Sequence, residues 1–314
     1  MKKIIARISN GFGNQMFIYA AAFCLAKKLN RKLELDISSG PRSLIKKNLK
    51  KKFKHFNPKF ELNCFNISSK ITNKNNCYNN FFSQILRKFY IYTDFLKIKK
   101  KFIIESKNSN KITYYNERGF DNLYLQDKVY FEGYFECEKY FVDCKKYLIK
   151  EFSLKRKVDC NIFFKKQILN SNSVSMVIRA DRFNERTSDD LQVSNILKSK
   201  DFELKQYKYI VRSMNYFKNI ISNPKFFIFS DNIPKIKHMF SNTKNVIFID
   251  QFTKNKVIED YYLMSLCKHF AVGPTTFHFW PAWLSNYKNK IILRPKNMNP
   301  SNNRDFWPID WIKI

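Results

Sequence analysis

Acidic residues are scarce in this sequence of 314 residues. Only 26 Asp and Glu stand against 58 Lys and Arg, which gives a formal net charge of +32. A field of this sign favours polyanions, anionic membrane surfaces or phosphorylated molecules as partners. AT-rich codon usage is a second explanation, because Lys, Asn, Phe and Ile are all abundant. Codon usage does not explain the shortage of acids, so both explanations stay open.

Long hydrophobic runs are also missing. No apolar stretch reaches the roughly 18 residues that a membrane-spanning helix needs, so we expect no transmembrane helix. The chain starts with basic residues, but the apolar run after them is too short for a signal peptide. Any membrane contact should therefore be peripheral. Hydrophobic residues still make up 44% of the chain, which is ample for a buried core and argues against global disorder.

Paired cysteine motifs do not occur. The seven cysteines are odd in number and contain no CxxC pair, so neither a disulfide framework nor a zinc site is indicated. Buried, reduced thiols in a cytosolic protein are the expectation. The cysteines are Cys24, Cys64, Cys77, Cys137, Cys144, Cys160 and Cys267.

The chain shows no internal repeat and no linker rich in Pro, Gly or Ser. Strands and helices alternate instead, which predicts parallel sheets with crossover helices. We expect an α/β fold with two Rossmann-like domains, residues 1–155 and 156–314, facing each other across a cleft. The predicted strands are 3–8, 33–36, 129–135, 173–179, 226–229, 246–249, 269–272 and 291–293. The predicted helices are 14–28, 204–215, 258–267 and 277–284, with another from residue 138.

Residues 41–128 are harder to interpret and carry two basic runs. Seven basic residues and no acid lie between Arg42 and Lys54, and Lys97–Lys101 holds four lysines. Ile45, Leu49 and Phe53 have helical spacing inside the first run, which predicts a basic amphipathic helix. Such a helix either presents a solvated face or contacts an anionic membrane.

The first candidate site is a glycine loop, Gly11-Phe12-Gly13-Asn14-Gln15, between a predicted strand and a predicted helix. Glycines permit close approach of a ligand, and a helix N-terminus offers N–H groups and a positive dipole end to phosphate. A dinucleotide site would have a third glycine where Met16 stands, which weakens that interpretation. The alternative is a tight turn with Asn14 as the helix cap. Taken alone, the loop favours the turn.

Two further candidates lie at predicted strand ends. The strand 173–179 delivers Arg179, Asp181 and Arg182 to the carboxyl edge of the sheet, where open α/β sheets bind ligands. Arginine at that edge can bind phosphate oxygens bidentately. Asp231 follows the strand 226–229 and can accept hydrogen bonds from a base or ribose. A surface ion pair and a helix N-cap are the respective alternatives.

The densest candidate is Gly273-Pro274-Thr275-Thr276-Phe277. The two threonines follow a predicted strand and open a predicted helix, so their hydroxyl and N–H groups form a cradle for a diphosphate. The aromatic residues beyond them are expected in the core, among them Trp280 and Trp283.

These segments together resemble bacterial α-1,2-fucosyltransferases, the glycosyltransferase family 11. The resemblance runs from the first strand to the last residues, and residues 41–128 contribute little. The run Leu263-Met264-Ser265-Leu266-Cys267-Lys268-His269 is its most specific part. The other parts are Gly11–Phe17, Tyr130–Tyr134, Phe227–Asp231 and Trp307–Trp311. The family implies a GT-B-type fold, a GDP-sugar donor, inversion at the anomeric carbon, and neither metal nor cofactor.

The resemblance also implies roles for single residues. Gly11, Gly13, Asn14 and Gln15 would lie near the donor, Asp231 would face guanine or ribose, and Arg179 would hold the β-phosphate. Thr275, Thr276 and Phe277 would match the family's Ser-Ser-Phe segment at the diphosphate. Asp181 and Arg182 are the candidate acid and second cation.

The sequence departs from the family at its His-x-Arg-Arg-x-Asp signature. Val177 stands in place of the histidine and Ala180 in place of the second arginine, and His278 stands where the family has serine. The implied donor is GDP-L-fucose, and these changes keep another GDP-linked deoxysugar or a heptose as the alternative. A catalytically inactive family member is a second alternative.

The resemblance implies an oligosaccharide or lipid-linked glycan as acceptor in surface polysaccharide or lipopolysaccharide synthesis. The protein would be cytoplasmic, with the basic runs contacting the anionic inner membrane. A nucleic-acid-binding protein is the rival class, prompted by charge and aromatic content. No recognisable nucleic-acid motif occurs, so no nucleic-acid partner is expected.

Overall fold

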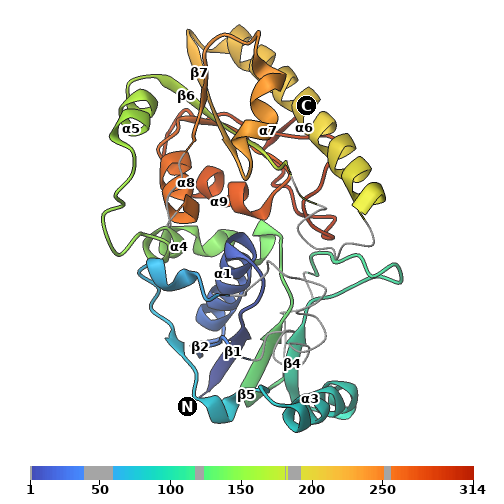
Figure 1. Ribbon diagram of the computed structural model, residues 1–314. Helices are drawn as coiled ribbons and strands as arrows, with labels where there is room; N and C mark the ends of the chain where they lie inside the picture. Colours follow the sequence, from blue (N-terminus) through green and yellow to red (C-terminus); the bar gives the residue numbers. More distant parts are fainter. Residues whose placement is uncertain (1, 39–58, 117–123, 181, 183–191, 251–255) are drawn as a thin grey trace. The chain divides into compact units, whose positions relative to one another are not determined.

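The computed structural model describes residues 2–38, 59–116, 124–180, 182, 192–250 and 256–314. The chain divides into two compact units (Figure 1). Of the described residues, unit 1 holds 2–38, 59–116, 124–155 and 301–308, and unit 2 holds 156–180, 182, 192–250, 256–300 and 309–314. Each described unit is built on one parallel sheet, so the expected α/β class with two Rossmann-like units is confirmed.

Unit 1 has a five-stranded sheet in the order β3-β2-β1-β5-β4. Every neighbouring pair is parallel. The order turns back at β1, which has β2 on one side and β5 on the other. The strands are β1 Lys3–Arg7, β2 Lys32–Asp36, β3 Lys70–Ile71, β4 Lys100–Ile104 and β5 Leu125–Glu132. The helices are α1 Phe12–Lys28, α3 Phe81–Thr93 and α4 Lys145–Glu151.

Helix α1 is buried on more than the one face that its pattern predicted. A helix that is apolar around most of its circumference must be covered on several sides. The Phe17 ring meets Phe141 at 5.8 Å and Phe306 at 5.7 Å between centroids. The expected division assigned residues 301–308 to the second domain. In the structure they pack with unit 1, because Phe306 is fully buried and Asn303 Nδ2 donates to Glu105 Oε1.

Unit 2 has a six-stranded sheet in the order β11-β10-β9-β6-β7-β8. Numbered within the unit, this is 6-5-4-1-2-3, the strand order of a Rossmann fold. Its topological switch point therefore lies between β6 and β9. The strands are β6 Asn172–Ile178, β7 Pro224–Ser230, β8 Val246–Phe248, β9 His269–Ala271, β10 Ile292–Arg294 and β11 Ile312–Lys313. The helices are α5 Ile162–Leu169, α6 Gln192–Ile220, α7 Ile233–Lys237, α8 Lys256–Ser265 and α9 Thr276–Leu284.

Strand β6 alternates between the two faces of this sheet. Val174, Met176 and Ile178 join the core that α6 and α7 cover. The opposite face carries Ser173 and Ser175, both fully buried. Ser173 Oγ accepts from the Lys268 backbone N–H at 3.2 Å, so the polar side chain has a partner. A strand buried on both faces is typical of parallel sheets.

Helix α6 is longer than the predicted 204–215. Its first half carries polar side chains on the buried side, namely Ser199, Glu203 and Gln206. Amphipathic periodicity detects a helix from the spacing of its apolar residues. It therefore does not detect a helix segment whose buried face is polar. Elements within residues 41–128 that the pattern did not resolve include β3, β4 and α3.

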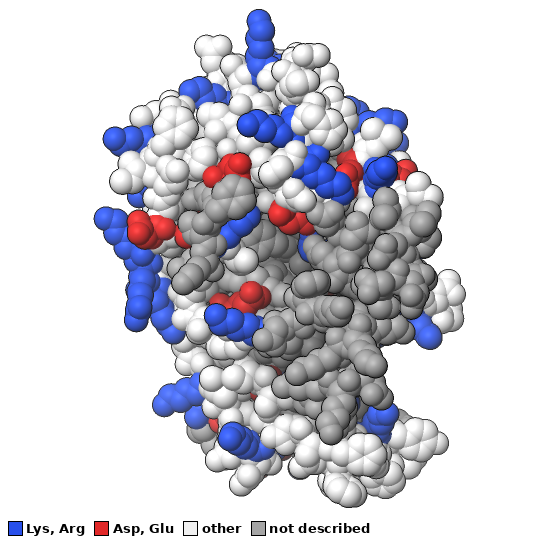
Figure 2. All heavy atoms as spheres, in the orientation of Figure 1, with Lys and Arg blue, Asp and Glu red and all other residues white. Residues whose placement is uncertain are grey.

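The first basic run, with Ile45, Leu49 and Phe53, lies outside the described residues. Among the residues that are described, no helix is long and apolar enough to span a membrane. Lys and Arg side chains are spread over the face seen in Figure 2 rather than gathered into one patch.

Candidate functional site

The switch point of unit 2 brings two predicted segments together. Gly273 follows β9 and packs directly on the end of strand β6, at Val177. A Cβ at Gly273 would lie 2.6 Å from the Val177 carbonyl oxygen, so only glycine fits without a shift of the backbone. The chain after β9 therefore passes close to the residue preceding Ile178 and Arg179. Open α/β sheets bind their ligands at this position.

Thr275 caps helix α9 at the same edge. Its Oγ1 accepts from the His278 backbone N–H at 3.0 Å, and the residue is buried. Thr276 and Phe277 form the first turn, are partly exposed, and carry no acidic neighbour in that turn. The Phe277 ring meets Tyr261 edge-on at 6.4 Å. The helix N-terminus thus directs its positive dipole end and N–H groups to the carboxyl edge of the sheet.

His278 supports this turn from inside the protein. Its Nδ1 accepts from the Gly273 backbone N–H at 3.1 Å, and its Nε2 lies 2.9 Å from Ser175 Oγ. Because Nδ1 accepts, the proton resides on Nε2, which donates to the serine. Complete burial lowers the pKa of His278 to about 3, so the ring is neutral. His278 stands where the family has serine, and in this chain it has a buried hydrogen-bond partner, Ser175.

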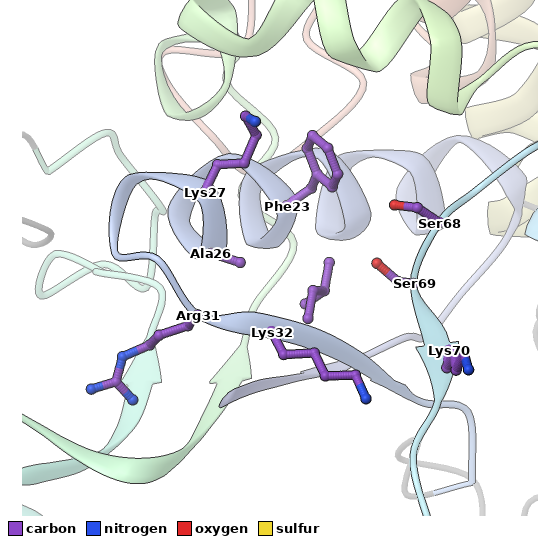
Figure 3. A pocket seen from close by; sticks show the side chains of 9 residues that line it. Phe23, Ala26, Lys27, Arg31, Lys32, Ser68, Ser69 and Lys70 are labelled. Atoms are coloured by element: carbon purple, nitrogen blue, oxygen red, sulfur yellow. The ribbon is translucent and has the colours of Figure 1, made fainter. Parts of the chain in front are cut away.

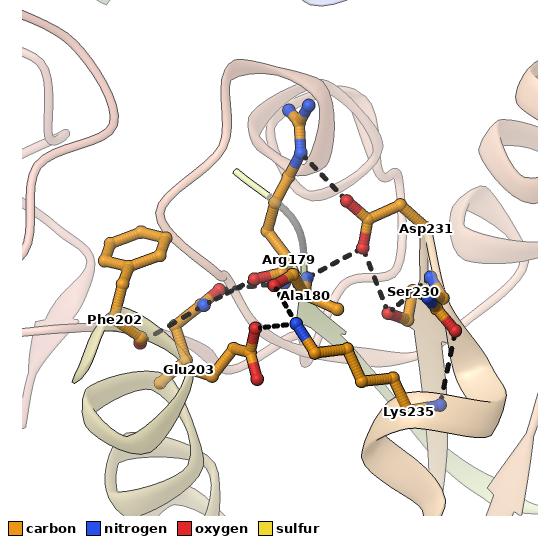
Figure 4. A network of polar contacts seen from close by, with 9 residues as sticks. Arg179, Ala180, Phe202, Glu203, Ser230, Asp231 and Lys235 are labelled. Atoms are coloured by element: carbon orange, nitrogen blue, oxygen red, sulfur yellow. Dashed lines mark hydrogen bonds and ion pairs between the residues drawn. The ribbon is translucent and has the colours of Figure 1, made fainter. Parts of the chain in front are cut away.

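Arg179 is held by its backbone and its side chain (Figure 4). Gln206 Oε1 accepts from Arg179 N at 2.9 Å, and Gln206 Nε2 donates to Arg179 O at 3.0 Å. Arg179 Nε donates to Asp231 Oδ2 at 3.3 Å. Figure 4 shows the two terminal guanidinium nitrogens directed away from Asp231. The side chain is 32% exposed, so the backbone and Nε of Arg179 are held in place while the terminal guanidinium nitrogens reach solvent.

Asp231 serves as the anchor of this network. Its Oδ1 accepts from Ala180 N at 2.7 Å and from Ser230 Oγ at 3.2 Å. Lys235 Nζ donates to Ala180 O at 3.1 Å and forms a 2.5 Å ion pair with Glu203 Oε1. The structure thus brings Asp231 to Arg179, as two neighbouring strand ends require.

Arg182 lies beyond this network. Its Nη2 donates to Pro300 O at 3.1 Å, and its guanidinium lies 5.9 Å from the Phe202 ring centroid. Asp181 is outside the described residues.

The glycine loop of unit 1 lies at the corresponding switch point, between β1 and β5. Asn14 Nδ2 donates to Glu136 Oε1, and Asn10 Nδ2 donates to Tyr134 Oη, each at 2.7 Å. Gly11 occupies the N-cap position of α1, and no side chain caps the helix there. A Cβ at Gly11 would meet nothing within 4 Å and its φ is −79°, so the fold itself does not require glycine there.

Gln15 is engaged wholly within the protein. Its Nε2 donates to Asn10 O at 2.8 Å and to Lys59 O at 2.7 Å, and its Oε1 accepts from Glu61 N at 3.0 Å. Gly13 is buried in the first turn of α1. The Glu61 carboxylate accepts from the Phe12 backbone N–H, while burial raises the pKa of Glu61 above its usual value. Gln15 therefore shapes the loop by joining it to the segment around Glu61.

Sequence reasoning missed Gln206, Lys235, Glu61 and Glu136 as supporting residues. Gln206 is fully buried, and a buried amide within a helix must find partners, but its burial shows only in the folded chain. The others depend on contacts between segments far apart in the sequence, which no local pattern shows.

A hollow of about 250 Å³ also lies in unit 1 (Figure 3). Lys32 and Leu33 at the start of β2 and Lys27 at the end of α1 line it, so it lies at the opposite edge of the sheet from the glycine loop. Arg31 donates to Gln126 O at 2.6 Å, and Lys27 lies over the Tyr147 ring at 3.8 Å. Two of the cations that line the hollow, Arg31 and Lys27, thus contact other groups of the protein.

Comparison with known proteins decides the family. A model described as glycosyl transferase family 11 matches residues 3–314. The chain belongs to this family. The resemblance stated from the sequence motifs is thereby confirmed, and the protein is a glycosyltransferase.

Two curated relatives from Escherichia coli match this family 11 chain along its length. An "alpha-1,2-colitosyltransferase" is 28% identical and covers 100% of this chain and 99% of its own. The "O-antigen biosynthesis glycosyltransferase WbnK" is 25% identical and covers 98% and 99%. Among solved structures, the fucosyltransferase NodZ from Bradyrhizobium is similar at a TM-score of 0.48 and 12% identity, covering 89% and 91% of the two chains.

Proposed function

We propose that this family 11 protein transfers a deoxysugar from a GDP-sugar to a hydroxyl group of a surface glycan, with inversion at the anomeric carbon. The observation that carries the proposal is the carboxyl edge of the unit 2 sheet, where Arg179 and the N-terminus of α9 lie at a Rossmann switch point. A diphosphate there would meet one guanidinium and the N–H groups of Thr276 and Phe277.

In the proposed reaction, the acceptor oxygen bonds to the anomeric carbon while the bond to the diphosphate oxygen breaks. GDP leaves with the electron pair, so negative charge develops on the diphosphate. Fixed positive groups at that point lower the barrier most when they need no rearrangement. Arg179 meets this condition because Gln206 and Asp231 hold its backbone and Nε. We propose Asp181 as the general base that accepts the proton of the acceptor hydroxyl.

The remaining donor contacts are proposed from position. Gly11 and Asn14 are proposed as donor contacts from the motif resemblance, and a Cβ at Gly11 would enter open space. Gln15 would act by holding the loop rather than by touching the donor. Asp231 would act by orienting Arg179, and Arg182 would supply a second cation.

The sugar itself is proposed as L-fucose or a related GDP-linked deoxysugar. The fucose assignment comes from the motif resemblance, and the related sugar is supported by a relative named as a colitosyltransferase. Val177 and Ala180 give the donor edge smaller, uncharged side chains than the family signature has. Ala180 is fully buried and contributes only backbone atoms to the Asp231 and Lys235 contacts.

The acceptor is proposed as an oligosaccharide or lipid-linked glycan of O-antigen synthesis, supported by the role that the name of one relative states. We propose the cytoplasm as the place of action. All seven cysteines are free thiols in the structure, and a reducing compartment keeps them so.

A thermal-shift panel of GDP, GDP-fucose, GDP-colitose, GDP-mannose and UDP-sugars tests the donor. Stabilisation by the GDP compounds, followed by transfer from one of the deoxysugars, is the expected result. Stabilisation by UDP compounds alone would overturn the donor class. Binding of GDP-sugars without transfer or hydrolysis would identify an inactive family member instead.

Metal independence is proposed because protein cations supply the charge at the diphosphate. Transfer rates should be the same, within about twofold, in excess EDTA and in Mg²⁺. A loss of transfer in EDTA that added Mg²⁺ restores would refute this part of the proposal.

A further inference from the structure

Helix α3 of unit 1 presents its apolar residues to solvent. Its outward face carries aromatic and aliphatic side chains that are 46–81% exposed. They recur at helical spacings of three and four residues, so they form one continuous stripe along the helix. These residues are Phe81, Phe82, Ile85, Leu86, Phe89 and Tyr92, and we call them the α3 stripe.

The inward face of the same helix shows that this orientation is specified. Arg87 Nε donates to Glu132 Oε1 at 2.7 Å, and Gln84 Nε2 donates to the Tyr78 carbonyl. Tyr90 and Ile91 pack against the core residues around Phe102. Polar groups thus face the protein while the α3 stripe faces out. Rotation of the helix would leave the Glu132 carboxylate, 8% exposed, with fewer cationic partners.

The stripe continues into the connection to β4, where Leu96 and Ile98 are 71% and 87% exposed. Apolar side chains in this number and continuity exceed the scattered exposure that is normal for a monomer. In Figure 2 the region over α3, located from Figure 1, is mostly white with Lys or Arg beside it.

The residues around the α3 stripe are mostly basic. Between residues 81 and 104 the chain holds six basic residues and one acid, Asp94. That acid is buried, and its carboxylate accepts the backbone N–H groups of Lys101 and Phe102. It therefore offers no countercharge at the surface. Burial, together with the neighbouring positive charges of Lys97 and Lys128, lowers the pKa of Lys101.

We propose that the α3 stripe and its flanking lysines dock unit 1 on an anionic lipid bilayer. Aromatic and aliphatic side chains enter the boundary between headgroups and acyl chains, while lysines at the edge of the stripe contact lipid phosphates. Lys88 and Lys99 are the exposed cations closest in sequence to the stripe and its continuation. This contact is distinct from the basic run at residues 42–54, and it does not depend on the proposed donor chemistry.

Vesicle flotation of the full-length protein tests the docking site. Phosphatidylcholine vesicles with and without phosphatidylglycerol serve as the probe. The test variant is Phe82→Ser/Phe89→Ser, whose side chains are 81% and 57% exposed, so the fold should be retained. The matched control is Ile162→Ser/Phe163→Ser on α5, where the two side chains are 67% and 59% exposed.

The wild type and the α5 control should float with the anionic vesicles, and the α3 variant should show roughly tenfold or more weaker partitioning at an unchanged Tm. A Lys88→Gln/Lys99→Gln variant should weaken binding similarly at low salt, with the difference shrinking at high salt. Equal binding of the α3 variant and the wild type would overturn the proposal, as would absence of wild-type binding to anionic vesicles. If the α3 variant instead loses self-association that the wild type shows, with vesicle binding unchanged, the stripe is a homodimer interface and the proposal fails.

Discussion

His278 and Ser175 form a buried hydrogen bond of 2.9 Å that joins helix α9 to strand β6. The other imidazole nitrogen accepts from Gly273 N, so one neutral ring connects the strand, the turn and the helix at the carboxyl edge of the unit 2 sheet. A charged ring would lose the Gly273 contact, because a protonated Nδ1 is a donor and the Gly273 N–H has no acceptor to offer it.

Stability should therefore fall as the pH is lowered from neutrality. Burial lowers the pKa of His278 to about 3, and burial with Lys268 lowers that of His269 to about 4, against an ordinary value of 6.5. At a pH between the folded and the unfolded pKa of each histidine, the unfolded chain binds more protons than the folded chain. Stability is fully present above the unfolded pKa and is lost as pH falls toward the folded pKa, by up to about 1.4 kcal/mol per pH unit and histidine.

Urea unfolding at several pH values between 7 and 5 measures this slope. A His278→Gln variant should show a shallower loss than the wild type, and His238→Gln, a substitution of an exposed histidine, is measured beside it. Identical slopes for the wild type and His278→Gln would show that His278 does not titrate as described.

Two glycine variants distinguish a structural requirement for glycine from a requirement for ligand binding. Gly273→Ala should destabilise the protein by about 1–3 kcal/mol, because the added Cβ would lie 2.6 Å from the Val177 carbonyl oxygen. Gly11→Ala should change stability by less than about 1 kcal/mol, since its φ is ordinary and its Cβ meets nothing within 4 Å. If the donor occupies that open space, Gly11→Ala should raise the Kd for GDP-sugar. An unchanged Kd would remove Gly11 from the donor site.

Gln206→Ala should impair the enzyme by releasing the Arg179 backbone. Loss of the two hydrogen bonds of a fully buried amide should lower the free energy of unfolding by about 1–3 kcal/mol. As a positioning residue, Gln206 should affect kcat more than KM for the acceptor, at a temperature where the variant stays folded. A variant that loses stability but keeps kcat would limit Gln206 to a structural role.

If Arg179 holds the leaving diphosphate as proposed, Arg179→Ala should reduce transfer by roughly a hundredfold or more, because it removes a preorganised cation. Arg212→Ala, a variant of an exposed arginine on α6, is the control and should retain wild-type transfer. Arg179→Lys should recover only part of the activity, since ammonium cannot reproduce bidentate contacts. Unchanged transfer by a folded Arg179→Ala would refute the assignment.

The sequence alone determined the alternation of strands and helices and the placement of Arg179, Asp231 and Thr275 at strand ends. Periodicity shows such elements because parallel strands are buried on both faces and glycine or threonine interrupts the apolar pattern after them. The motifs also determined the family, which the match over residues 3–314 confirmed.

Only the tertiary structure decided which residues support the site and where the remaining segments belong. Gln206, His278 and Gln15 act through partners that are distant in sequence or in the opposite layer, and the polar buried residues of α6 hid the first half of that helix. Residues 301–308 join unit 1 because Phe306 packs on Phe17, a contact between the two ends of the chain. The outward orientation of the α3 stripe likewise follows from the Arg87–Glu132 ion pair, since periodicity defines an apolar face but not the side to which it turns.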